Sequence, residues 1–218
     1  MGLMDDIADF ARKAAYAAVL RNLLFFKPKP GQNGWSRGGT AIDEIVLHGT
    51  ESLGTQEQSA NSLTGLGNSI HYFIGRDQGL AYSIISEDLQ AAHAGNPNRH
   101  PTVQDHNPRS IGIEMYQRDI STFKGDASKL DFTDWQYDTV AMLVYDIRRR
   151  RNIARDMVVG HSAVNNIDRA DPRNFDWGRF NRRVDELSRT LGGLLGPSFQ
   201  LDPVIPAPVT FMQFPRGW

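Results

Sequence analysis

Two histidines stand directly after short apolar runs, and this placement suits catalysis. His48 follows Ile45-Val-Leu, His161 follows Met157-Val-Val-Gly, and small residues come next in both cases. Catalytic groups collect at strand ends because the scaffold is rigid there and the following residues are free to form a pocket. Asp171 lies ten residues beyond His161. We therefore treat His48, His161 and Asp171 as one candidate set.

Two neutral imidazoles and one carboxylate form a ligand set for zinc. Catalytic zinc sites use three protein ligands and keep the fourth position for water, whereas structural sites close all four. The chain has no cysteine, so a metal site must use His, Asp or Glu. The alternative is that each histidine is an ordinary polar residue. Spacing alone leaves this alternative open, because the three residues are far apart and no compact His-Glu-x-x-His pattern is present.

The composition is that of a globular chain with little net charge. Of its 218 residues, 40% are hydrophobic and 22% charged, and the net charge is -1. This balance gives no electrostatic argument for nucleic acid or an anionic membrane as a partner. Apolar runs of about 18 residues are absent, so we expect no transmembrane segment.

Strand-like and helical patterns alternate along the middle of the chain. We expect strands at 43–48, 69–75, 80–85, 110–116 and 157–159, and helices at 56–66, 133–150 and 177–191. The helix at 133–150 has the strongest pattern, since Thr133 can cap it and apolar residues recur at intervals of three and four. The alternation predicts an α/β fold with a central mixed β-sheet flanked by helices.

Two further regions flank the expected main domain, which spans residues 41–191. Residues 1–40 read as an amphipathic helix (4–26) and a Gly-rich linker (31–40), and residues 192–218 as a Gly/Pro-rich extended tail. The helix either packs on the domain or docks on a partner or membrane surface, and the aromatic tail packs on its own domain or on a partner. Acidic residues near the N-terminus replace the basic start of a Sec signal, so we expect none.

Five stretches, in order, resemble the type 2 N-acetylmuramoyl-L-alanine amidases, a superfamily that includes phage lysozyme-like amidases and animal peptidoglycan recognition proteins. They are IVLHGT (45–50), HYFIGRD (71–77), AAHAG (91–95), SIGIE (110–114) and VVGHS (158–162), followed by DP (171–172) and FDW (175–177). The resemblance covers roughly residues 42–190. It implies a zinc-dependent enzyme that hydrolyses the amide bond between N-acetylmuramic acid and L-alanine in peptidoglycan, with 41–191 as the zinc amidase domain.

The resemblance also assigns roles to individual positions. His48, His161 and Asp171 match the zinc ligands of the family. Glu114 matches the acidic residue that orients or deprotonates the attacking water. Arg169 stands where relatives often have a Lys that stabilises the oxyanion, and Arg keeps the charge and donates in a fork.

Three further residues are candidates for substrate binding. His93 matches a histidine that lines the substrate groove, although a structural histidine bonded to backbone is the alternative. Phage relatives carry a Tyr where Ile70 stands, and Tyr72 is a possible substitute because it shares a face with Ile70 if the strand alternates. Asn96 opens a Pro/Asn-rich loop beside the groove. His106, later in that loop, is expected to be exposed.

Two other functions remain open from the sequence. One is an inactive peptidoglycan-binding recognition module, but such modules usually lose a zinc ligand and all three candidates are present here. The other is a cytoplasmic amidase that recycles soluble anhydromuropeptides. For a bacteriolytic enzyme without a Sec signal, we expect synthesis in the cytoplasm and release to the periplasm or cell wall through a holin or a secretion system. The sequence does not choose between an endolysin, a secreted effector and a recycling enzyme.

Overall fold

A computed structural model describes residues 26–95, 104–117, 131–165, 167 and 169–195 of the chain. Three predictions lie wholly or mostly outside these residues: the N-terminal helix over 4–26, the extended tail over 192–218, and Asn96 as a substrate contact. Residues 192–195 of the predicted tail are described and belong to a helix that ends at Leu195. The division of the chain at residues 40 and 191 therefore stays a prediction.

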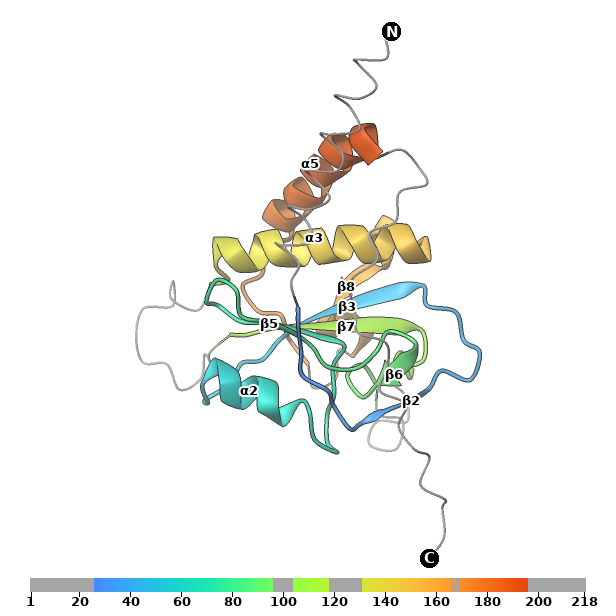
Figure 1. The fold of residues 1–218 in the computed structure, drawn as a ribbon, viewed down its shortest axis with the longest axis vertical. Coiled ribbons are helices and arrows are strands. Elements are labelled where there is room, and N and C mark those ends of the chain that lie inside the picture. The colour runs from blue at the N-terminus through green and yellow to red at the C-terminus, as the bar shows by residue number, and fades with distance from the viewer. Residues whose placement is uncertain (1–25, 96–103, 118–130, 166, 168, 196–218) are drawn as a thin grey trace, which may run out of the picture.

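A six-stranded mixed sheet forms the centre of the described structure (Figure 1), in the order β1-β5-β4-β7-β3-β8. Its strands are β1 (Lys27–Pro28), β3 (Glu44–Gly49), β4 (Tyr72–Ile74), β5 (Ala81–Ser83), β7 (Ser110–Met115) and β8 (Val158–Gly160). Strands β4 and β5 are antiparallel, and the other neighbours pair in parallel. A second, two-stranded sheet pairs β2 (Gly34–Ser36) with β6 (Leu89–Ala91) in antiparallel fashion.

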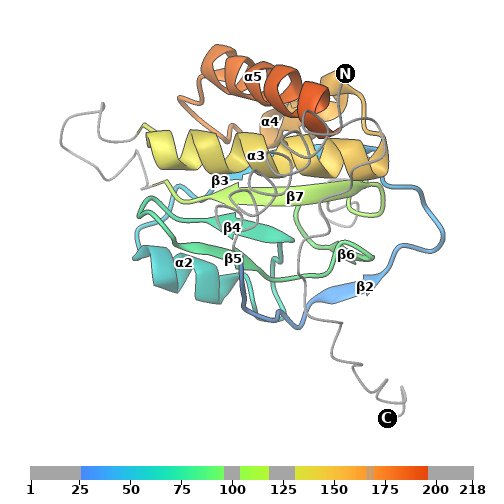
Figure 2. The same ribbon diagram turned by 45° about the horizontal axis from the view of Figure 1, so that its top comes forward.

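Helices cover both faces of the main sheet. Helices α3 (Asp134–Arg151) and α5 (Trp177–Leu195) lie on one side, and α2 (Gln56–Ser62) lies on the other (Figure 2). The short elements η2 (Arg155–Met157) and α4 (His161–Val164) flank β8. This arrangement confirms the predicted α/β fold with a central mixed sheet. Of the helices in the described part of the chain, none is long and apolar enough to cross a membrane.

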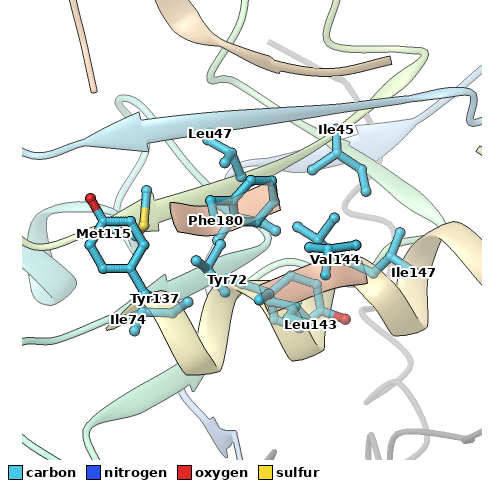
Figure 3. Packing of buried hydrophobic residues seen from close by; sticks show 14 of the residues in the cluster. Ile45, Leu47, Tyr72, Ile74, Met115, Tyr137, Leu143, Val144, Ile147 and Phe180 are labelled. Atoms are coloured by element: carbon cyan, nitrogen blue, oxygen red, sulfur yellow. The ribbon is translucent and has the colours of Figure 1, made fainter. Parts of the chain in front are cut away.

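The main core lies between the sheet and α3 (Figure 3). Alternation along a strand sends successive side chains to opposite faces. Ile111, Ile113 and Met115 of β7 therefore belong to this core, which leaves Ser110, Gly112 and Glu114 for the opposite face. The face of the sheet away from α3 is thus free to carry polar groups.

Local sequence explains why α3 forms where it does. Thr133 accepts a hydrogen bond from the backbone of Gln136, and the Gln136 side chain bonds back to the backbone of Thr133, which closes a capping box. The helix ends at Asn152, whose φ of 55° is left-handed, as is common just past a helix end. The predicted helix at 133–150 is therefore confirmed almost to the residue.

A buried ionic group, which we call the Glu87 network, joins the end of α3 to the loop before β6. Arg150 donates to both carboxylate oxygens of Glu87 at 2.8 Å, and Arg151 donates to the same carboxylate. Tyr72 donates its hydroxyl to Glu87 at 2.7 Å, and Arg150 also bonds Asp146 at 2.8 Å. Since Glu87 is only 3% exposed, these bonds replace its hydration.

The predicted linker over 31–40 is wrong as a description of the structure. Its residues 34–36 form β2, and Arg37 is 7% exposed. The Arg37 guanidinium donates to backbone carbonyls of Glu87, Pro108 and Ser110, so it fastens this segment to the body of the domain. Short strands such as β2 exist through pairing with β6, which a local pattern does not reveal.

Candidate active site

His48 and His161 meet because their strands are parallel neighbours. Strand β3 pairs with β8 in a register that sets Leu47 opposite Gly160, so the next residues lie side by side: His48, still within β3, and His161, the first residue after β8. Asp171 reaches the same place because its backbone carbonyl accepts a hydrogen bond from the amide of Ser162, at 3.1 Å. The structure thus brings together the three side chains that the sequence singled out.

The three side chains offer one ligand atom each at closely similar separations. His48 Nδ1 and His161 Nδ1 are 3.0 Å apart, and Asp171 Oδ2 lies 3.4 Å from the first and 3.2 Å from the second. Ligands bound at about 2.0–2.2 Å to a tetrahedral ion lie about 3.3–3.6 Å apart, close to the spacing seen here. Two imidazole nitrogens and a carboxylate oxygen are also a donor set that divalent transition metals accept. These residues therefore fit a single metal ion.

The protonation of His48 and of Asp171 suits metal binding. Burial is the largest cause that lowers the pKa of His48 to about 4, so its ring is neutral at pH 7. Burial alone would raise the pKa of Asp171, but the neighbouring imidazoles of His161 and His48 hold it well below its ordinary value. A neutral imidazole and an ionised carboxylate are the forms that bind metals.

Glu114 is the acidic side chain next to this set. Strand β7 pairs with β3 so that Glu114 stands opposite His48, and it is 9% exposed. Burial, followed by the nearby charge of Asp171, raises the pKa of Glu114 well above its ordinary value. A carboxyl group with a raised pKa is suited to take up a proton and to give it back. Arg169 is exposed and lines the same pocket.

A polar pocket of about 400 Å³ opens onto these groups. A cavity of this size takes a small ligand or one segment of a larger one. Hydroxyl and amide side chains beyond the ligand set also line it: Thr50, Ser52, Ser59, Ser62, Asn68, Ser69 and Asn165. These residues were not predicted from the sequence, since single polar residues in loops and on α2 follow no pattern that would single them out.

His93 lines the pocket, as expected, and also touches the ligand set. Its Nδ1 lies 3.0 Å from Nε2 of His48. Burial, and then the neighbouring histidines, lower the pKa of His93 well below its ordinary value, so the ring is neutral. His71 is fully buried, and its Nδ1 accepts the amide proton of Gly112 at 2.9 Å, so its role is structural.

Two predictions about side chains near the site are wrong. Tyr72 is 2% exposed, packs in the core on the α3 side and donates to Glu87, so it is not placed to bind substrate. We expected Ile70 and Tyr72 to lie on the same face of one strand. Strand β4 begins only at Tyr72, however, and Ile70 belongs to a separate apolar cluster. His106 is not exposed: its Nδ1 lies 2.7 Å from Glu44 Oε2, and 14% of its side chain is exposed.

The fold is a mixed sheet flanked by helices, and its candidate site is a group of three side chains that could hold a metal ion, beside a polar pocket. The chain belongs to the N-acetylmuramoyl-L-alanine amidase family, whose model matches residues 38–174. This confirms the resemblance found in the sequence and makes the chain an amidase of that type. No curated protein sequence matches the chain.

Solved structures share the fold at low sequence identity. An AmpD derivative is 23% identical with a TM-score of 0.57, over 73% of this chain and 94% of that one. AmiD from E. coli, in complex with anhydro-N-acetylmuramic acid-L-Ala-D-gamma-Glu-L-Lys as its substrate, is 23% identical with a TM-score of 0.53, over 71% and 60%. A mutant endolysin from Bacillus subtilis is 18% identical with a TM-score of 0.50, over 73% and 99%.

Proposed function

We propose that the chain is a zinc-dependent hydrolase of the amide bond between N-acetylmuramic acid and L-alanine, in peptidoglycan or in muropeptides. The observation that carries the proposal is the set of ligand atoms of His48, His161 and Asp171, 3.0 to 3.4 Å apart at a polar pocket. The substrate bound to AmiD contains this bond, which supports the substrate class. A module that only binds peptidoglycan would not need an intact ligand set with a buried carboxyl beside it.

Zinc is the ion that best suits this donor set, with His48, His161 and Asp171 as its ligands. When bound, it supplies a Lewis acid that polarises the scissile carbonyl and lowers the pKa of water to about 7. The neutral state of His48 and the ionised state of Asp171 make both side chains ready to bind without first losing a proton.

Glu114 acts as the general base and then as the general acid. Its carboxylate accepts a proton from the attacking water and returns it to the L-alanine nitrogen as that amine leaves. The burial that raises its pKa makes it a stronger base than an exposed carboxylate, so one group can serve both steps. Arg169, at the exposed side of the pocket, donates to the oxyanion of the tetrahedral adduct.

The test is digestion of purified sacculi and of soluble anhydromuropeptides, with and without a chelator, followed by mass spectrometry. Stem peptides with a free L-alanine amino terminus are the expected product, and added zinc restores their release after chelation. Asp171→Asn and Glu114→Gln should both be inactive, whereas Glu57→Gln, an exposed carboxylate on α2, should match wild type. Release of the same peptides in the presence of chelator, or fragments cut at another bond, would overturn the proposal.

The same experiment separates the biological roles. Activity on intact sacculi supports a lytic enzyme that reaches the cell wall through a holin or a secretion system. Activity confined to soluble muropeptides supports a recycling enzyme of the cytoplasm. If the protein is a lytic enzyme, residues 1–25 or 196–218 could dock it to a partner or to the cell wall. Deleting each segment and measuring binding to sacculi tests this role.

A further inference from the structure

His48 has a second ring nitrogen, and a defined partner holds it. Nδ1 faces the other two ligand side chains, which leaves Nε2 for another contact. Nε2 lies 3.0 Å from Nδ1 of His93. Two imidazole nitrogens at this distance share one proton, so one ring donates and the other accepts. The direction of this bond decides which nitrogen of His48 has a free lone pair.

The direction follows from the far end of a chain of hydrogen bonds. Ser110 Oγ is 2.7 Å from the backbone carbonyl of His106, and a carbonyl only accepts, so the hydroxyl proton points there. Ser110 Oγ then accepts from Nε2–H of His93, at 3.2 Å. The neutral His93 ring has its lone pair on Nδ1, where it accepts the proton on Nε2 of His48. Nδ1 of His48 is left unprotonated and directed at the metal position.

Two features of the fold hold His93 in this position. The side-chain oxygen of Asn107 accepts the backbone amides of His93 and Ala94, at 2.9 and 2.7 Å. Gly112 provides the space for the ring, because a Cβ there would lie 2.7 Å from His93 Cγ and Nδ1. Ser110, Gly112 and Glu114 share the site face of β7, so one strand supports His93 and also carries the proposed base.

We propose that His93 is a positioning residue, which together with Ser110 and the His106 carbonyl fixes the tautomer of His48 and thereby sets the affinity for the metal ion. This inference rests on the proposed metal site. It differs from the groove-lining role, in which His93 would contact substrate and leave the metal unaffected. Partners that orient a metal-binding histidine typically account for about 10- to 100-fold in metal affinity.

The test is a zinc dissociation constant for the full chain, measured by competition with a chelator and without any substrate. His93→Phe keeps a ring but removes the acceptor, and should weaken zinc binding by about 10- to 100-fold. Ser110→Ala should weaken it less, and His93→Gln should recover part of the loss because its amide oxygen can accept. Glu57→Gln, which changes an exposed carboxylate on α2, is the control with unchanged affinity.

A second readout follows the proton itself. In nitrogen-15 NMR spectra of the zinc-loaded protein, Nε2–H of His48 should give a slowly exchanging signal that disappears in His93→Phe. Circular dichroism of the metal-free variants confirms that they fold. An unchanged zinc constant in His93→Phe, with a raised KM, overturns the inference and leaves the proposed function standing. If zinc binding depends on His93 but muropeptides are not hydrolysed, the inference stands and the proposed function is overturned. If the wild-type protein binds no zinc, both the inference and the proposed function are refuted.

Discussion

The Glu87 network and the ligand cluster (His48, His161 and Asp171) are both buried and ionisable, yet they differ in how their protons are shared. In the Glu87 network each carboxylate oxygen faces a donor from Arg150, Arg151 or Tyr72. In the ligand cluster, lone pairs of two imidazoles and a carboxylate converge on one point. Satisfied buried groups stabilise a fold, whereas converging lone pairs need a cation that the protein itself does not supply.

The largest effect is expected for Glu114→Gln. Removing the proposed base should lower kcat by about 10²- to 10⁴-fold while zinc stays bound. Because the pKa of Glu114 is raised in the folded protein, the protonated carboxyl favours the folded state. This contribution to the free energy of unfolding is lost as pH rises through that pKa. The variant, which never ionises, should therefore unfold at no lower urea concentration than wild type at pH 8 in the metal-free state. Near-normal turnover would show that Glu114 is not the base.

Glu87→Ala should lower the stability of the fold and leave turnover unchanged, the reverse of the result expected for Glu114→Gln. It leaves Arg150 buried without its main partner, which costs about 3–5 kcal/mol of unfolding free energy. The zinc dissociation constant and kcat per folded molecule should not change, because the network lies on the other side of the sheet from the pocket. Asp185→Ala, which removes an exposed partner of Arg155, is the control and should cost under about 1 kcal/mol. A change in zinc affinity in Glu87→Ala would mean that the two clusters are coupled.

The Glu87 network also predicts a dependence of stability on pH. Burial would raise the pKa of Glu87, but Arg150 outweighs it and lowers this pKa from 4.5 to about 2. The stabilisation is complete above pH 4.5 and is lost as pH falls toward 2, which amounts to roughly 3 kcal/mol.

Urea unfolding of wild type and Glu87→Gln from pH 6 to pH 2.5 measures this effect. The difference in unfolding free energy between the two should shrink across that range, because the variant has no carboxylate to protonate. Burial raises the pKa of Asp146 to about 6, so Asp146 contributes in the opposite sense, with stability lost as pH rises through 6. A pH-independent difference would contradict the assignment to Glu87.

A smaller effect is expected for Gly112→Ala, which tests how tightly the site face is packed. The added methyl group meets the His93 ring and Ile70, and overpacking of this kind costs about 1–3 kcal/mol. It should also weaken zinc binding, since the His93 ring must shift. Gly65→Ala, where a Cβ meets nothing within 4 Å, is the matched control and should be neutral by thermal melting.

The sequence predicted the parts of the molecule that depend on local patterns. Helix α3 was evident from Thr133 and its apolar spacing, and β3 and β8 from their apolar runs, so His48 and His161 could be placed at the ends of strands. That these two strands are neighbours is seen only in the structure. Strands β1, β2 and β6 were not predicted, because two or three residues show no period. They owe their conformation to pairing, β1 with β5 and β2 with β6.

The contacts between segments distant in sequence could not be predicted. The bond from His48 to His93, and from His93 to Ser110, joins three stretches that the resemblance had treated as separate motifs. The misplacement of Tyr72 has a similar origin, because the start of a short strand decides which side chains face the pocket. Pairings such as His106 with Glu44 arise only when the loop folds back on β3.

The position of Asp171 and His161 relative to His48 has a consequence for the integrity of the whole domain. His161 is 113 residues beyond His48, so an ion shared by them closes a long loop through the centre of the chain. A bound ion of this kind acts as a reversible cross-link. At ion concentrations above the dissociation constant, the free energy of unfolding rises with the logarithm of the free ion concentration. The rates of proteolysis and thermal inactivation should therefore fall as the concentration of free metal ion rises, so the lifetime of the protein, as well as its turnover, should depend on the ions around it.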